Sequence, residues 1–74
     1  MNLKRFLTII AKQLNFGNAD EITMDMTFSD DLVLDDDEYY ELLEILEEEF
    51  NVDLIEYDGE FDSLAELAHI IRQG

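Results

Sequence analysis

The sequence predicts an all-α domain, a bundle of three main helices and one short helix with a long first loop. Three segments repeat apolar residues at the spacing of one helix face. The chain has no Pro, and its three Gly lie at positions 17, 59 and 74, outside or between these segments. A length of 74 residues leaves room for one small domain, which we place at residues 1–74.

The first predicted helix lies at the N-terminus and ends at Asn15-Phe16-Gly17. Its apolar stripe consists of Leu3, Phe6, Leu7, Ile10 and Leu14. Residues 18–35 follow with no clean period, and they predict a long loop whose scattered apolar side chains enter the core. A loop of this length in so small a domain is often functional.

The second predicted helix spans Asp36 to Phe50 and has the clearest pattern. One apolar stripe is formed by Tyr39, Leu42, Leu43, Leu46 and Phe50. Acidic residues cover the remaining surface, namely Glu38, Glu41, Glu44, Glu47 and Glu48. Three Asp at positions 35–37 crowd the start, where carboxylates satisfy free N–H groups and the helix dipole.

The C-terminal segment predicts a short helical turn within residues 55–60, ended near Gly59, and then the last helix. Ser63 and Glu66 match a capping box, with Ser63 as the N-cap. The apolar face of this last helix consists of Leu64, Leu67, Ala68 and Ile71.

Composition narrows the function classes. Twenty acidic residues stand against four basic ones, a formal net charge of -16, which excludes binding to the phosphate backbone of nucleic acids and to anionic membranes. An apolar content of 47% indicates a folded core in spite of this charge. Without Cys there is no disulfide, thiolate zinc site or Cys nucleophile. No signal peptide or membrane span is evident, so we expect a cytoplasmic protein. We also expect a monomer.

Several short segments in combination resemble acyl carrier proteins. They are Ile22-Thr23, Thr27-Phe28, Asp31-Leu32, Glu41-Leu42-Leu43 and Leu46-Glu47-Glu48-Glu49-Phe50. The resemblance implies a bundle of three main helices and one short one. The chain also resembles small bacterial acyl-carrier-like proteins, which share an acidic pair, here Asp36-Asp37, and a Phe-x-Val-Asp motif, here residues 50–53.

The residues that carry the function of that family are different here. Acyl carrier proteins attach phosphopantetheine to the Ser of an Asp-Ser-Leu motif, and the matching stretch reads Asp35-Asp36-Asp37. A carboxylate at this position would form a mixed anhydride that hydrolyses readily, so we expect no cofactor. We interpret Asp36 as an acidic N-cap; the alternative is that its charge imitates the modified Ser.

A second Asp-Ser-Leu sequence occurs at residues 62–64. No acidic recognition helix follows it, and we interpret Ser63 as a helix cap. The alternative is a working carrier that is loaded at Ser63, Ser29 or another hydroxyl.

The resemblance implies a surface for partners, because the second helix of acyl carriers meets Arg/Lys patches of their enzymes. We therefore predict a non-catalytic interaction module that binds a basic protein, such as a fatty-acid or polyketide-type enzyme. The predicted partner-binding residues are Asp36, Asp37, Tyr40, Glu41, Glu44, Glu47 and Glu48. The alternatives are a merely solvated acidic face and an acidic mimic of nucleic acid that inhibits a DNA-binding protein.

Catalysis and metal binding find little support in the sequence. His69 is the only His and has no obvious nucleophile beside it, so we expect a surface or half-buried helix residue and no enzyme. No window has the residue pattern of a calcium-binding loop. We predict no catalytic residues and no metal site, although non-specific divalent binding at Asp35, Asp36 and Asp37 remains open.

Overall fold

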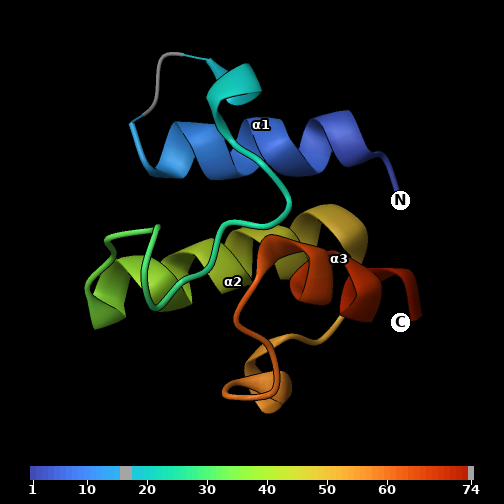
Figure 1. Cartoon of the computed structure of the whole chain (residues 1–74). Coiled ribbons are helices and arrows are strands. Elements are labelled where there is room, and N and C mark those ends of the chain that lie inside the picture. Colours follow the sequence, from blue (N-terminus) through green and yellow to red (C-terminus); the bar gives the residue numbers. More distant parts are fainter. Residues whose placement is uncertain (16–17, 74) are drawn as a thin grey trace.

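The computed structural model describes residues 1–15 and 18–73, and within them it is built of helices joined by loops (Figure 1). The elements are α1 (Leu3–Gln13), the 3-10 helix η1 (Ala19–Glu21), α2 (Asp36–Phe50), the 3-10 helix η2 (Ile55–Tyr57) and α3 (Leu64–Gln73). Pairing of β type among the described residues is limited to one isolated bridge between Thr27 and Ser63. The predicted all-α bundle of three helices and a short helical turn is confirmed, whereas η1 was not predicted.

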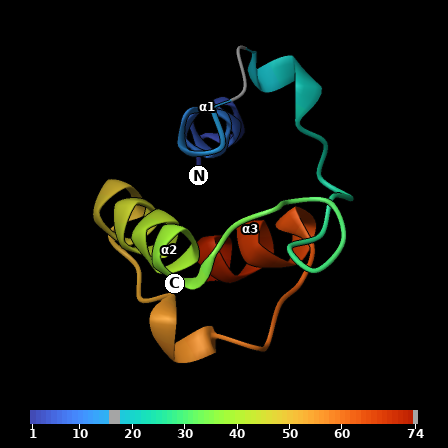
Figure 2. The same cartoon turned by 90° about the vertical axis from the view of Figure 1, so that its left-hand side faces the viewer.

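The three α-helices surround one hydrophobic core. α1 and α2 run in opposite directions (Figure 1), and the view along α1 places α2 and α3 side by side beneath it (Figure 2). The largest fully buried side chains come from all three helices and from the segment after α2: Phe6, Ile10, Leu42, Leu43, Leu46, Leu54, Leu64 and Leu67. The predicted apolar stripes of α2 and α3 therefore face this core.

The predicted stripe of α1 was partly wrong. Ile9 and Ala11 are buried, while Leu3 is 37% exposed and lines a surface hollow between α1 and η1. Leu3 is the first residue of the helix and lies at its end, where it does not reach the core. α1 ends at Gln13, and Asn15 has a left-handed φ of 61°. Phe16 and Gly17, the rest of the predicted helix end, lie outside the described residues.

The long loop contributes to the core as predicted. Ile22 and Leu32 are buried, and four half-buried side chains pack against the core: Met24, Met26, Phe28 and Leu34. The predicted turn near residue 59 is also present, because η2 is followed by Gly59 with a φ of 88°. Glycine adopts this conformation without a steric penalty.

The loop also completes the N-terminus of α3. The backbone N–H groups of Leu64 and Ala65 donate to the carbonyls of Met26 and Met24, both at 2.9 Å. The first N–H groups of a helix have no partner within it, so these bonds satisfy two otherwise free donors. These bonds hold the loop against α3. They thereby fix the position of the segment that leads to α2.

Candidate functional site: the acidic face of α2

The N-terminus of α2 is closed by a capping box between Asp35 and Glu38. The N–H of Glu38 donates to Oδ1 of Asp35 at 2.8 Å, and the N–H of Asp35 donates to Oε1 of Glu38 at 3.2 Å. The prediction that Asp36 caps the helix was therefore wrong. Asp35 has the extended backbone of an N-cap, whereas Asp36 is already the first helical residue. This leaves the carboxylates of Asp36 and Asp37 exposed at the positive end of the helix dipole.

The outer surface of α2 is formed largely by carboxylates. Six of the seven predicted partner-binding residues are exposed: Asp36, Asp37, Tyr40, Glu41, Glu44 and Glu48. Residues three and four positions apart share one side of a helix, so Glu41, Glu44 and Glu48 form a continuous stripe. No Lys or Arg occurs in the sequence between Lys12 and Arg72. The negative charge of this face is therefore not balanced by bases from the same region of the chain.

Glu47 has a different place from its acidic neighbours. It is half-buried, and its Oε2 accepts hydrogen bonds from the backbone N–H of Leu54 at 2.6 Å and of Ile55 at 3.2 Å. These bonds join the last turns of α2 to the start of η2. The carboxylate of Glu47 thus has a structural role, because it fixes the segment that follows α2 against the helix. Its backbone donors lie seven and eight residues later, a separation that no helical or turn pattern indicates.

Two adjacent tyrosines of α2 share one carboxylate. The hydroxyls of Tyr39 and Tyr40 donate to the two oxygens of Asp58, at 2.8 and 2.9 Å. Tyr39 also packs edge-on against Phe28, with ring centroids 5.4 Å apart. Burial and the bond to Asp58 raise the pKa of Tyr39, and the same carboxylate, with a smaller contribution from Asp36, raises the pKa of Tyr40. Sequence analysis missed Asp58, for which the sequence offers only a turn signal with Gly59.

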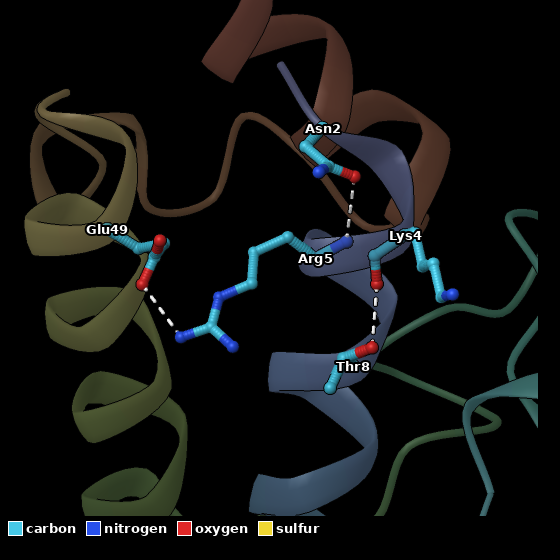
Figure 3. A network of polar contacts seen from close by, with 5 residues as sticks. All are labelled: Asn2, Lys4, Arg5, Thr8 and Glu49. Carbon is cyan, nitrogen blue, oxygen red and sulfur yellow. Dashed lines mark hydrogen bonds and ion pairs between the residues drawn. The ribbon is translucent and has the colours of Figure 1, made fainter.

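An ion pair between Arg5 and Glu49 joins α1 to α2. The guanidinium of Arg5 points to the carboxylate of Glu49 (Figure 3). Its Nη2 lies 3.0 Å from Oε1 of Glu49, and both side chains are partly exposed. The carboxylate raises the pKa of Arg5 further above its usual value through this hydrogen bond and charge. Surface pairs of this kind contribute little to stability, because both charges remain in contact with water. The same view shows the Asn2 side chain capping α1 through the N–H of Arg5.

The two serines considered for modification are both bonded to carboxylates. Ser29 donates from its N–H and its hydroxyl to the two oxygens of Asp62, at 3.0 and 2.7 Å. Ser63 accepts from the N–H of Glu66 at 3.1 Å, and its own N–H donates to Oε1 of Glu66 at 3.0 Å. The predicted capping box of α3 is thus confirmed. The backbone N–H groups of Ser63 and Asp62 lower the pKa of Glu66.

No group of three or more His, Cys, Asp or Glu among residues 1–15 and 18–73 is arranged to hold a metal ion. None of the helices described is both long and apolar enough to cross a bilayer. His69 is exposed on α3, as the sequence predicted.

Comparison with known proteins places the chain in a family. No protein-family model matches it. The chain is 37% identical over 67 residues to the acyl carrier protein of Borrelia garinii, an alignment that covers 89% of this chain and 82% of that protein. It is 39% identical over 66 residues to the acyl carrier protein of Clostridium perfringens, an alignment that covers 88% of this chain and 86% of that protein. The chain therefore belongs to the acyl carrier protein family.

Proposed function

We propose that this chain is an acyl-carrier-like interaction module that carries no phosphopantetheine and docks on a basic surface of a protein partner through α2. The observation that carries the proposal is the exposed acidic face of α2, which begins with Asp36 and Asp37 where carriers have Ser and Leu. The family relationship suggests that the partner is an enzyme of fatty-acid or polyketide synthesis. Such a partner would bring Lys and Arg side chains to the carboxylates.

Surface shape and charge support docking at this face. A shallow hollow near the C-terminal end of α2 is lined by Glu44, Glu47, Glu48, Asn51, Val52 and Asp53. A Lys or Arg side chain that enters this hollow would meet several carboxylates at once. Long-range attraction by a net charge of -16 would also speed encounter with a basic partner, and this effect weakens as salt is added.

The absence of the prosthetic group is tested by intact mass after incubation with coenzyme A and a phosphopantetheinyl transferase. We expect the wild-type mass to stay unchanged. The double variant Asp36→Ser, Asp37→Leu restores the Asp-Ser-Leu motif at the start of α2 and serves as the positive control. A wild-type chain that gains the mass of phosphopantetheine, whether at Ser29, Ser63 or elsewhere, would overturn this part of the proposal.

Docking is tested by calorimetric titration against purified fatty-acid synthesis enzymes from the same organism at low salt. A triple Lys variant of Glu41, Glu44 and Glu48 should lose most of the affinity. A second triple Lys variant, at Glu21, Glu56 and Glu60, changes the net charge equally but lies off α2 and should bind more tightly than the first. Equal losses in both variants would mean that total charge matters and that α2 is not the docking surface.

A further inference from the structure

Val33 is the most exposed large hydrophobic side chain of the described residues, at 92% exposure. Its neighbours point the other way, because Leu32 is buried and Leu34 is half-buried against the core. Both flanking leucines are turned toward the core, and Val33 between them is left in solvent. The exposure of Val33 thus follows from how its neighbours pack.

The backbone around Val33 is fixed on both sides. Before it, the N–H groups of Asp31 and Leu32 donate to the carbonyl of Thr27, at 3.0 and 2.9 Å. The side chain of Asp31 in turn accepts from the N–H of Thr27 at 2.9 Å. After it, the capping box of Asp35 and Glu38 closes the start of α2. A residue whose backbone is held in this way loses little backbone freedom on binding, which favours Val33 as an anchor.

The charges around Val33 are all of one sign. Five of the eight residues from 30 to 37 are Asp, and none is basic. Asp36 and Asp37 lead directly into the acidic face of α2, where Tyr40 follows Asp36 by one turn and is 40% exposed. An apolar group surrounded by carboxylates is complementary to an apolar pocket surrounded by Lys and Arg.

We propose, on the basis of the docking function above, that Val33 is the apolar anchor of the interface and enters a small apolar pocket rimmed by basic residues on the partner enzyme. The Asp residues around Val33 favour a basic protein over other binding partners. An anionic lipid surface and a second copy of a chain with a net charge of -16 would both be repelled by the Asp residues on either side of Val33. The basic rim supplies attraction over a distance, and burial of Val33 supplies affinity after contact.

The test compares Val33→Ser with Ile55→Ser in titrations against the fatty-acid synthesis enzymes that bind the wild-type chain. Ile55 is 42% exposed on η2 and provides a matched change away from the anchor. We expect Val33→Ser to weaken binding about tenfold or more, because an apolar side chain is no longer buried. Its melting temperature and the salt dependence of its binding should stay as in the wild type, and Ile55→Ser should bind within about twofold of it.

The outcomes separate this inference from the proposed function. If Val33→Ser binds as tightly as the wild type while the Glu41, Glu44 and Glu48 reversals abolish binding, the anchor is wrong and docking through α2 stands. If both serine variants lose affinity equally, Val33 contributes no more to binding than Ile55, and the proposal that it anchors the interface is wrong. If the wild type binds none of the enzymes, both proposals are overturned. A smaller negative heat-capacity change for Val33→Ser would agree with the loss of buried apolar surface.

Discussion

The carboxylate of Glu47 accepts the backbone N–H of Leu54 at 2.6 Å, and this contact joins α2 to the segment that leads into η2. The side chain of Leu54 is fully buried, so the bond also positions a core residue. Glu47 lies between acidic residues that point to solvent, yet its role is internal. Charge density alone therefore does not identify which carboxylates of α2 are free to meet a partner.

Replacement of Glu47 by Ala should destabilise the fold by about 1–3 kcal/mol, because two backbone donors lose their acceptor. Urea unfolding measures this free energy. Glu48→Ala is the matched control, since it removes the same charge from an exposed neighbour and so accounts for relieved repulsion. Equal stabilities of the two variants would contradict the structural role of Glu47.

The sequence predicted those features that depend on residues close together along the chain. The apolar stripe of α2 follows from helical spacing, and the capping box of Ser63 and Glu66 from a separation of three residues. The long-range contacts could not be predicted. Glu47 with Leu54 is one example, and Tyr40 with Asp58, 18 residues apart, is another. Such pairs depend on how the segments pack, and no local pattern encodes that packing.

Two predictions at helix starts, Asp36 as the N-cap of α2 and Leu3 as part of the buried stripe of α1, were wrong because they depend on the packing of neighbouring segments. Acidic residues at positions 35–37 all suit an N-cap, and only the backbone angles and hydrogen bonds of the structure assign Asp35 to that position. Leu3 belongs to the apolar stripe of α1 by spacing, but whether the end of a stripe is covered depends on the neighbouring elements. In the candidate site, helical spacing predicted that Glu41, Glu44 and Glu48 share one side of α2, and the structure leaves all three exposed. The exposure of Val33 depends on the burial of the residues beside it, which no spacing indicates.

Removal of the Ser63 hydroxyl should destabilise the protein by about 1 kcal/mol, within the range of 0.5–2 kcal/mol known for N-caps. In Ser63→Ala the N–H of Glu66 loses its acceptor at the start of α3. Thermal unfolding followed by circular dichroism measures the change, with Ser63→Thr as the control that keeps a hydroxyl. A Ser63→Ala variant as stable as Ser63→Thr would contradict the capping role.

The tyrosine pair predicts loss of stability at alkaline pH. Both Tyr39 and Tyr40 have raised pKa values in the folded state, above the ordinary value of about 10. The unfolded chain therefore releases these protons first, and the stability that the raised pKa values provide is complete below pH ~10 and declines as the pH rises further. Unfolding free energies measured across this range should show the decline.

Asp58→Asn provides the control for the tyrosines, because it removes the negative charge and retains a side chain of the same shape. Titration of tyrosinate absorbance should show the phenol pKa values moving down toward the ordinary value in this variant. Identical titration curves for the variant and the wild type would mean that Asp58 does not govern the two hydroxyls.

Added salt should stabilise the fold, because the exposed carboxylates of Glu41, Glu44 and Glu48 lie at helical spacing on α2 and repel one another. Each like-charged pair at helical spacing costs about 0.2–0.5 kcal/mol, so relief of several such pairs amounts to about 1 kcal/mol. In a domain of this size that corresponds to a rise of about 4–8 °C in melting temperature between low and ~0.5 M sodium chloride. The triple Lys variant of Glu41, Glu44 and Glu48 should respond less to salt, since it has fewer like-charged pairs to screen. If the melting temperature of the wild type does not change with salt, the carboxylates on this face do not destabilise the fold by repulsion. Relief of that repulsion would then give no reason for a basic partner to bind there.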